Sequence, residues 1–482
     1  MKSADIGIIG LAVMGENLCL NIESKGFCVS VYNRTVQKTQ DFISSRAKGK
    51  NIIGCDNLEE FIGTLKTPRK IMLMVKAGQV VDDFISMLLP LLNEGDIIID
   101  GGNSHYLDSI RRTKHLEQSK LYFIGAGVSG GEEGALNGPS IMPGGSYAAW
   151  EHIKDIFTAI SAKTEDMSPC CGWVSSDGAG HFVKMVHNGI EYGDMQLICE
   201  AYQIMRQYLC MSTDEMHVVF NDWNKGRLNS YLIKITADIL AYKENGVIVI
   251  DNILDQAGQK GTGKWAGVAS FELGVPLTTI SEAVYARFLS TLKNERMYAS
   301  KILPSPKIVL PENKVAFISS IKNALYAAKV ISYAQGFALL KSAAKEYNWQ
   351  IDFGNIALIW RGGCIIRSAF LDNIKDAFSN NPNLDNLLVD PFFKSEIEKS
   401  QEGFRDVCAA AMLNGVSIPA FSSALAYYDG YRAACLPANL LQAQRDYFGA
   451  HTYERLDMPK GEFFHTNWTG KGGNTSSSSY NA

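Results

Sequence analysis

Short apolar runs alternate with longer amphipathic segments in the first third of the chain. The runs are Ile6 to Ile9, Val29 to Tyr32, Ile71 to Val75, Ile97 to Ile99 and Tyr122 to Ile124. Most of them end at glycine or polar turn residues, which is typical of buried strands. Strands that alternate with helical segments form βαβ units, so the pattern predicts a Rossmann-like α/β domain with a parallel sheet.

The pattern changes near Gly178. From there to about Ala434, long helical periods of Leu, Ala, Ile and Met dominate and strand signals fade. Beyond Gly470 the chain is rich in glycine and serine and forms no core of its own, so this end is either disordered or lies on a partner. We predict an α/β domain over residues 1–177, a large all-α domain over 178–434 and an extended C-terminal tail over 435–482.

A polar stripe interrupts the apolar pattern between Gly180 and Gly193. At helical spacing its members fall within an arc of roughly 100°, and they are Lys184, His187, Asn188 and Glu191. Because apolar residues cover most of the remaining circumference, we expect the stripe to face a cleft rather than open solvent. Such groups can bind a polyhydroxylated anion and transfer protons. The alternative is a buried structural ion pair between Lys184 and Glu191.

The turn after the first apolar run predicts nucleotide binding. It reads Gly10-Leu11-Ala12-Val13-Met14-Gly15 and leads into a helical run, Glu16 to Lys25. Gly10 permits a sharp turn, Ala12 lets a pyrophosphate approach the backbone, and Gly15 allows close packing of a helix whose N-terminus faces the phosphates. The alternative is a tight turn without a ligand.

The end of the second run indicates which nucleotide is bound. It continues as Asn33-Arg34-Thr35, where an NAD-specific fold commonly has an acidic residue. Hydrogen-bond donors and a positive charge suit a 2′-phosphate, so we predict NADP in preference to NAD. The alternative is that Arg34 is a solvated loop residue.

Later strand ends reach the same edge of the predicted sheet, where ligands bind in such folds. They carry Val75-Lys76-Ala77 and Asp100-Gly101-Gly102-Asn103-Ser104, and Asn103 could orient a nicotinamide or a substrate. A third segment, Val128 to Gly134, contains Ser129, Gly130 and Gly131. Its hydroxyl and free backbone amides suit a carboxylate, and the alternative is a glycine-rich connector.

Composition narrows the class of protein. The chain has 482 residues, 46% of them hydrophobic, and a net charge of −4, so nothing recommends nucleic acid or an anionic membrane as a partner. Its 10 cysteines lack zinc-type spacing and read as reduced thiols. No signal-peptide pattern opens the chain and no apolar run approaches 18 residues, so we expect a soluble, cytoplasmic protein without a metal site.

Motifs along the whole chain together resemble one enzyme family. They are GLAVMGENL from Gly10, NRT from Asn33, DGGNS from Asp100, GVSGGEEGA from Gly127, GAGHFVKMVHNGIEYGDMQ from Gly178, GQKGTGKW from Gly258, WRGGCIIR from Trp360, QAQRDYFGAHTYE from Gln442 and FHTNWTG from Phe464. This set resembles the 6-phosphogluconate dehydrogenase family, which is NADP-linked and decarboxylating. No motif position departs from that family's pattern.

The resemblance implies an activity and a set of site residues. The activity is oxidative decarboxylation of 6-phospho-D-gluconate to D-ribulose 5-phosphate and CO₂ with reduction of NADP, a step of the pentose phosphate pathway. The implied substrate contacts are Ser129, Gly130, Gly131, His187, Asn188 and Tyr192 for the sugar acid, and Lys260, Thr262 and Arg287 for its phosphate. Arg445 and His451 would come from the neighbouring chain of a homodimer with crossing tails.

Within this scheme the stripe supplies the catalytic groups. Lys184 is the candidate base for the C3 hydroxyl, which requires its pKa to fall through burial and nearby cations such as Lys260 or Arg287. Protonated Lys184 then serves as the donor during decarboxylation, so no metal is needed, and the resemblance gives Glu191 the final protonation at C1. Two other interpretations are a non-decarboxylating β-hydroxyacid dehydrogenase and a catalytically silent NADP-binding protein.

Overall fold

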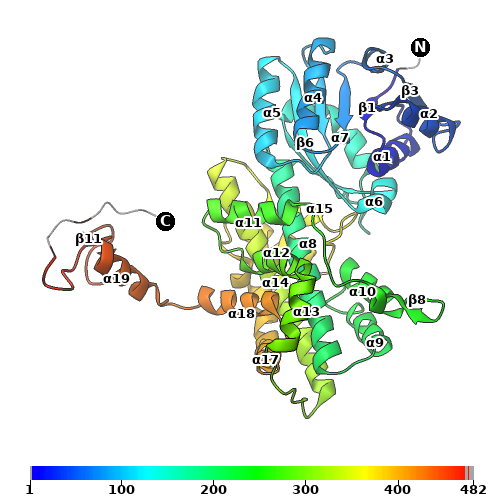
Figure 1. Ribbon diagram of the computed structural model, residues 1–482. Coiled ribbons are helices and arrows are strands. Elements are labelled where there is room, and N and C mark those ends of the chain that lie inside the picture. The colour runs from blue at the N-terminus through cyan, green and yellow to red at the C-terminus, as the bar shows by residue number, and fades with distance from the viewer. Residues whose placement is uncertain (1–2, 473–475, 477–482) are drawn as a thin grey trace. The chain divides into compact units, whose positions relative to one another are not determined.

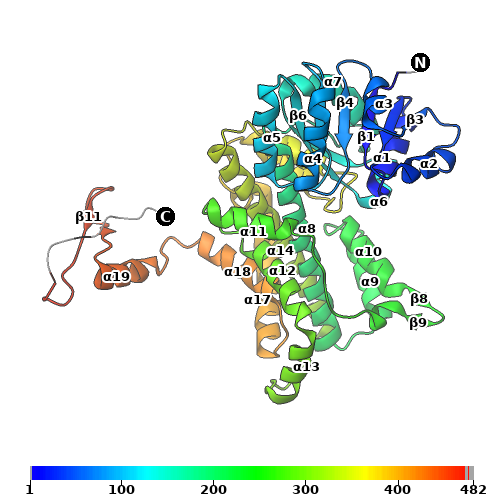
Figure 2. The same cartoon turned by 45° about the horizontal axis from the view of Figure 1, so that its top comes forward.

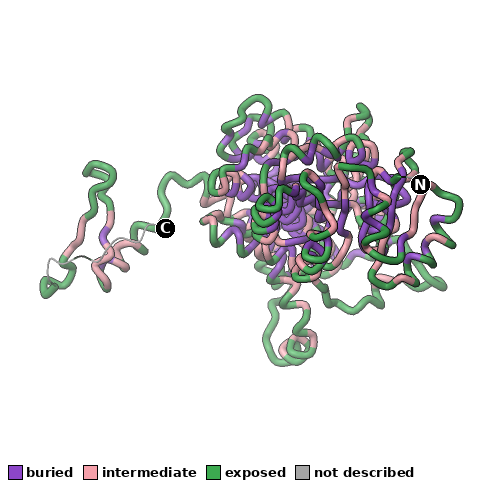
Figure 3. Tube along the Cα trace, turned by 90° about the horizontal axis from the view of Figure 1, so that it is seen from above, coloured by how far each residue is buried: buried purple, intermediate pink, exposed green. Residues whose placement is uncertain are grey.

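The computed structural model describes residues 3–472 and residue 476. Contacts divide these residues into two compact units, one reaching residue 424 and one beginning at residue 425. This division falls inside a helix, whereas the predicted boundaries at 177/178 and 434/435 follow changes in sequence pattern and stay predictions. Buried positions gather in the interior of the first unit, while the second unit carries mostly half-buried and exposed ones (Figure 3).

A seven-stranded sheet begins the first unit. Its order is β3-β2-β1-β4-β5-β6-β7, and all neighbours are parallel except β6 and β7. The strands are β1 (Ile6–Ile9), β2 (Val29–Tyr32), β3 (Ile52–Cys55), β4 (Lys70–Leu73), β5 (Ile97–Asp100), β6 (Tyr122–Ser129) and β7 (Ser140–Gly145). The helices between and after them are α1 (Val13–Ser24), α2 (Val36–Ser44), α3 (Leu58–Gly63), α4 (Gln79–Leu88), α5 (Tyr106–Gln118), α6 (Gly131–Asn137) and α7 (Tyr147–Ile160).

Helices cover both faces of this sheet, which explains why its strands are apolar runs rather than alternating ones. Ile97 and Ile99 pack in the core that includes α1 and α7. Ile98, between them, packs in the opposite core with residues of α4 and α5. The predicted Rossmann-like class is confirmed, and all five predicted strands are present.

Two strands of this sheet, β3 and β7, were not predicted, and β7 changes the sheet. β7 runs antiparallel to β6, so the sheet is mixed rather than purely parallel. The connection between Ser129 and Ser140 is too short for a parallel crossover, which needs a dozen or more residues. β7 also contains Pro143, which is tolerated because β7 is the edge strand and the amides of Ile141 and Gly145, two residues to either side, point away from β6, so the missing N–H of Pro143 costs no bond to β6.

The rest of the first unit is helical, as predicted. The helices are α8 (Ala179–Gln203), α9 (Thr213–Trp223), α10 (Tyr231–Ala241), α11 (Thr262–Glu272), α12 (Thr278–Thr291), α13 (Lys293–Ile302), α14 (Lys314–Glu346), α15 (Phe353–Ile359), α16 (Leu371–Asn380), α17 (Pro391–Leu413) and α18 (Pro419–Tyr431). α8 and α14 pack along each other at the centre, and α17 packs on α14 (Figure 1). A small hairpin, β8 (Lys243–Glu244) and β9 (Val247–Ile248), follows the packed pair α9 and α10 (Figure 2).

Glycines let the start of α8 lie directly on strands β6 and β7. A Cβ atom on Gly180 would lie 2.3 Å from the carbonyl oxygen of Gly125 and 2.5 Å from that of Met142. A Cβ atom on Gly127 would lie 2.4 Å from the Cβ of Lys184. No layer of side chains separates helix and sheet here, so the sheet backbone forms one wall around Lys184.

The other end of α8 holds the start of α18. Ala420 and Phe421 donate their backbone N–H groups to the two carboxylate oxygens of Glu200, both at 2.8 Å. Neither Ile418 nor Pro419 has a side chain that can cap these amides, so Glu200 of α8 takes the place of an N-cap residue. Burial raises the pKa of Glu200 to about 7, although these amides and Gln196 counteract the shift.

A buried carboxylate organises the second unit, which contains α19 (Ala438–Gly449), β10 (Tyr453–Glu454) and β11 (Phe463–Phe464). Asp446 accepts hydrogen bonds from the backbone amides of Thr452 and Thr466 and from the indole of Trp468, all between 2.9 and 3.0 Å. His465 is its fourth partner, at 2.9 Å. The predicted tail therefore contains a helix and a hairpin, and the end of its Gly- and Ser-rich segment, residues 473–475 and 477–482, lies outside the described residues.

We predict that Gly180→Ala destabilises the protein by about 3 kcal/mol or more, because the new methyl group meets backbone atoms that have no free rotamer to escape into. The control is Gly63→Ala near the end of α3, where a Cβ atom meets nothing within 4 Å and the change stays within about 1 kcal/mol. Urea unfolding of both variants measures the difference, and equal stabilities would refute direct contact between α8 and the sheet.

Candidate functional site

The polar stripe of α8 is buried in the first unit. Lys184 is 6% exposed, His187 0% and Asn188 9%. The ammonium of Lys184 donates to Oδ1 of Asn188 at 2.8 Å and lies 3.4 Å from Nδ1 of His187. Among the residues that the structure describes, Lys184 forms no ion pair with Glu191. The alternative of a self-neutralising structural pair is therefore wrong.

Lys184 is poised to lose its proton. Burial lowers its pKa to about 8, while the Glu191 carboxyl and the Cys364 thiol act in the opposite direction. The prediction that the pKa falls through burial is confirmed in direction. The nearby cations named for it, Lys260 and Arg287, are not among the groups that shift it.

His187 connects Lys184 to the end of strand β6. Its Nε2 lies 3.3 Å from Oγ of Ser129, and its Nδ1 lies 3.1 Å from Oδ1 of Asn188. Burial and the charge of Lys184 hold the pKa of His187 well below its usual value. A neutral imidazole can donate through one nitrogen and accept through the other, so His187 can bind a hydroxyl without adding charge to the site.

The pKa of Glu191 is shifted in the direction opposite to that of Lys184. Burial raises the pKa of its carboxyl, Lys184 and Arg287 counteract the shift, and Asp194 adds to it. Its side chain is 22% exposed, and one carboxyl oxygen lies 4.0 Å from Nδ1 of His187. One helix thus carries a lysine whose pKa is lowered and a glutamic acid whose pKa is raised, and such opposite shifts are how acid and base are assigned in active sites.

Tyr192 joins this helix to the residues predicted to hold a phosphate. The guanidinium of Arg287 stacks over the Tyr192 ring at 3.5 Å from its centroid. A Cβ atom on Gly263 would lie 2.5 Å from the same ring, so the first turn of α11 is also in contact with Tyr192. Thr262 begins α11, and its N-cap, Gly261, provides no side-chain cap. An uncapped helix N-terminus beside an arginine suits a phosphate dianion.

Lys260 lies just before this helix and is exposed. The structure therefore brings Tyr192, Thr262 and Arg287 together around the start of α11, with Lys260 adjacent in the chain. The roles of these side chains in binding stay a prediction.

The first turn of the sheet has the geometry that a dinucleotide needs. Gly10 has φ +103°, and a Cβ atom on Gly15 would lie 2.0 Å from the carbonyl oxygen of Gly10. α1 begins at Val13, and its N-cap Ala12 makes no side-chain cap, which leaves the helix N-terminus available to a pyrophosphate. Leu11 donates its backbone amide to Oδ1 of Asn33 at 3.1 Å.

The remaining predicted cofactor residues lie around this turn. Asn33 also donates to the carbonyl oxygen of Thr35 at 3.1 Å. Arg34 is exposed and makes no ion pair with any described residue, so its charge is available to an anion. Lys76 and Asn103 are exposed, whereas Val75 and Ala77 are half-buried.

The glycine-rich loop after β6 is held by the segment that begins at Trp360, which the sequence marked only as part of a motif. Gly130 has φ +112° and Gly131 has φ +62°, and a Cβ atom on Gly130 would lie 2.5 Å from the carbonyl oxygen of Gly363. The same segment supplies Cys364 beside Lys184 and Trp360, whose ring lies 5.7 Å from that of His187. No spacing or charge pattern in the sequence marks these contacts.

Arg445 and His451 belong to the second unit. Arg445 donates to Oε1 of Gln442 at 3.1 Å, and the His451 ring lies 5.9 Å from that of Phe448. Within this unit they lie on either side of the turn that ends α19. Their contribution to a neighbouring chain's site stays a prediction.

A Rossmann-like domain joined to a helical domain that presents a buried lysine and a glutamic acid defines a nucleotide-linked oxidoreductase. Two family models match the chain. The NAD binding domain of 6-phosphogluconate dehydrogenase matches residues 5–174, and the C-terminal domain of 6-phosphogluconate dehydrogenase matches residues 180–468. The chain belongs to the 6-phosphogluconate dehydrogenase family.

Full-length relatives agree with these domain matches. A decarboxylating 6-phosphogluconate dehydrogenase from Dictyostelium discoideum is 59% identical over 99% of this chain and 98% of its own length. The human decarboxylating enzyme is 58% identical over the whole of both chains. A Plasmodium falciparum 6-phosphogluconate dehydrogenase, solved alone, with its cofactor NADP⁺ and with its substrate 6-phosphogluconate, is 46% identical and superposes with a TM-score of 0.93 over 96% of this chain and 100% of its own.

Neither a membrane-spanning helix nor a metal-binding cluster is found among the described residues. Across residues 3–472 and 476, none of the helices is both long and apolar enough to cross a membrane. Within the same ranges, His, Cys, Asp and Glu side chains do not gather into a group of three that could hold a metal ion.

We predict that Lys184→Met gains stability in a pH-dependent way. Below about pH 8 the folded protein must bury an ammonium group, and a pKa lowered from 10.5 to about 8 corresponds to a cost of about 3 kcal/mol. Between pH 8 and 10.5 the folded chain releases this proton while the unfolded chain keeps it, so wild-type stability rises with pH and the advantage of the variant disappears.

Urea unfolding of wild type and Lys184→Met at several pH values from 7 to 10.5 measures this difference. Titrating groups that do not feel the charge of Lys184 behave alike in both proteins and cancel. A stability difference that stays constant over this range would show that the pKa of Lys184 is not lowered.

Proposed function

We propose that Lys184 and Glu191 divide the proton transfers in an oxidative decarboxylation of 6-phosphogluconate to ribulose 5-phosphate and CO₂, with NADP as the oxidant. The observation that carries this proposal is that burial shifts the pKa values of the two groups on α8 in opposite directions: the pKa of the lysine is lowered and that of the glutamic acid is raised. Full-length similarity to decarboxylating enzymes supports the choice of substrate.

In the first step Lys184 takes the proton of the C3 hydroxyl. Bound NADP supplies the hydride acceptor, so C3 loses a hydride and its oxygen loses a proton, which leaves a ketone. Neutral Lys184 can act as this base because its pKa of about 8 leaves part of the population unprotonated near neutral pH. Asn188 accepts a hydrogen bond from Lys184 and fixes its direction, while His187 binds a substrate hydroxyl.

In the second step the ketone oxygen takes the proton back. The bond between C2 and the carboxylate breaks, CO₂ leaves, and the electron pair moves toward the C3 oxygen. The ammonium of Lys184 donates to that oxygen, which yields an enediol without a metal ion. The same side chain therefore serves first as a base and then as an acid.

In the last step Glu191 protonates the carbon that carried the carboxylate. This carbon becomes C1 of ribulose 5-phosphate, and Lys184, neutral again after its donation, takes the proton of the enediol hydroxyl, so the enediol becomes the ketose. Burial raises the pKa of the Glu191 carboxyl and so favours its protonated form, which this role requires.

The remaining predicted residues bind and orient. Lys260, Thr262 and Arg287 hold the substrate phosphate at the start of α11, and Ser129, Gly130 and Gly131 hold its carboxylate. Arg34 binds the 2′-phosphate of NADP, since it is exposed and carries a free positive charge at the end of β2. A cytoplasmic location and the domain boundaries at 177/178 and 434/435 remain predictions from the sequence.

We also propose a homodimer in which each tail completes the neighbouring site with Arg445 and His451. Exposed apolar side chains on α19 support a docking role for the second unit, because a free surface rarely keeps so many of them. They are Leu440, Leu441, Tyr447 and Phe448.

The wild-type protein, incubated with 6-phosphogluconate and NADP, is expected to produce equal amounts of NADPH, CO₂ and ribulose 5-phosphate. Lys184→Met loses about 10³-fold in kcat because the general base is gone, and Glu191→Gln loses a similar factor in the final protonation. NADPH formation without CO₂ would favour a non-decarboxylating dehydrogenase, and binding of NADP without turnover would favour a silent binding protein.

Mixing two inactive variants tests the exchanged tails. In a heterodimer of Lys184→Met and Arg445→Ala chains, one site combines both substitutions and the other combines neither. Refolding the two variants together is therefore expected to restore about a quarter of wild-type activity, since half of the dimers are mixed and each has one intact site. Mixtures no more active than the separate variants would exclude a shared site.

A further inference from the structure

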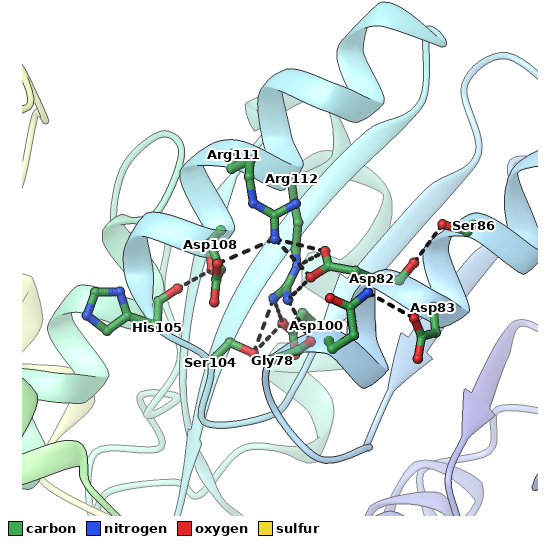
Figure 4. A network of polar contacts seen from close by, with 12 residues as sticks. Gly78, Asp82, Asp83, Ser86, Asp100, Ser104, His105, Asp108, Arg111 and Arg112 are labelled. Carbon is green, nitrogen blue, oxygen red and sulfur yellow. Dashed lines mark hydrogen bonds and ion pairs between the residues drawn. The ribbon is translucent and has the colours of Figure 1, made fainter.

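Arg112 of α5 contacts two loops of the sheet at once. Its Nη1 donates to Oδ2 of Asp100 at 3.1 Å and lies 3.4 Å from Oγ of Ser104. Its Nη2 donates to the carbonyl oxygen of Gly78 at 3.0 Å, and Nε and Nη2 both bond the carboxylate of Asp82. Figure 4 shows the guanidinium between these groups. Arg112 is only 1% exposed.

These contacts lie beside the loops predicted to bind the cofactor. Gly78 directly follows Val75-Lys76-Ala77 and precedes α4, and Asp82 lies in the first turn of α4. Asp100 and Ser104 enclose the turn that carries Asn103, and Ser104 donates to Asp100 at 2.6 Å. The two loops follow β4 and β5, which are adjacent parallel strands, at their carboxyl ends.

The guanidinium sets the spacing of the loops because it is planar and rigid. It bonds Asp82 through two nitrogens and reaches Asp100 through its third, so moving either loop breaks a charge-assisted hydrogen bond. Asp100 is fully buried and its other oxygen accepts from the backbone amide of Gly102, so its carboxylate has no solvent to replace a lost partner.

We propose that Arg112 is a positioning residue for NADP, which holds the loop of Val75 to Gly78 and the loop of Asp100 to Ser104 at the distance that the cofactor requires. This inference rests on the proposed function only for the identity of the cofactor. Arg112 itself lies behind the loops, so it acts through them rather than by touching the ligand.

The chain contains a matched control at the opposite edge of the same two strands. Arg69 immediately precedes β4, and Asp96 immediately precedes β5. They form an ion pair of 2.7 Å, and Asp96 also accepts from the backbone amide of Arg69 at 2.6 Å. This pair ties β4 to β5 as Arg112 does, but far from the carboxyl ends where the cofactor loops lie.

The experiment compares Arg112→Met, Arg112→Lys and Arg69→Met in the full-length protein. It measures the Kd of NADP by calorimetry, the Tm, and kcat and KM for the substrate. Arg112→Met is expected to weaken NADP binding about tenfold or more, and Arg112→Lys less, because one ammonium cannot reach both loops. Arg69→Met is expected to lower the Tm while leaving the Kd of NADP within about twofold.

An unchanged Kd in Arg112→Met, or an equal loss of affinity in Arg69→Met at a similar drop in Tm, would overturn the proposal. If Arg112→Met does not fold, Asp82→Asn carries the test, since it keeps the bonds of Arg112 to Asp100 and Gly78 and loses the ion pairs that Arg112 and Arg111 make with the first turn of α4. It is expected to weaken NADP binding about threefold, and an unchanged Kd would count against the proposal. Failure of the wild-type protein to bind NADP would instead refute the proposed function.

Discussion

Direct contact between α8 and the backbone of β6 and β7 is the constraint on which the site depends. Gly180 meets Gly125 at a distance that excludes even one methyl group. This contact places the base of the Lys184 side chain against Gly127, and burial of the ammonium at its far end lowers its pKa. Glycines at positions 125, 127 and 180 therefore allow the close packing in which the lysine is buried.

One helix carries two groups whose pKa values are shifted in opposite directions. Lys184 lies against the sheet, while Glu191, two turns further along, is close enough to Arg287 of α12 for that charge to act on its carboxyl. Burial acts on both and disfavours the charged form of each, so it lowers one pKa and raises the other. A shared ion pair would have cancelled both effects, and the bond between Lys184 and Asn188 avoids it.

The sequence predicted those features that depend on local spacing. The five strands, the turn at Gly10 and the stripe of α8 follow from periodicity and from residue types a few positions apart. β7 was missed because its Pro143 and two glycines oppose strand propensity, and only pairing with β6 makes it a strand. The cause of the lysine's lowered pKa was partly misjudged, because the distance of Lys260 and Arg287 from Lys184 is a property of the fold. Arg112 was also missed, since nothing in the sequence relates it to Gly78.

The bond between Glu200 and the first amides of α18 has a mechanical consequence. α18 leads by continuous chain into the unit that carries Arg445 and His451, and it begins on a carboxylate of the helix that carries Lys184. A force on the tail is therefore resisted by α8 itself. A proton on Glu200 turns one of its acceptors into a donor that faces an amide, so this anchorage slackens as the pH falls through about 7. The hydrogen bonds of Glu200 to α18 and the charge of Lys184 thus change over neighbouring pH ranges, although the two residues lie near opposite ends of α8.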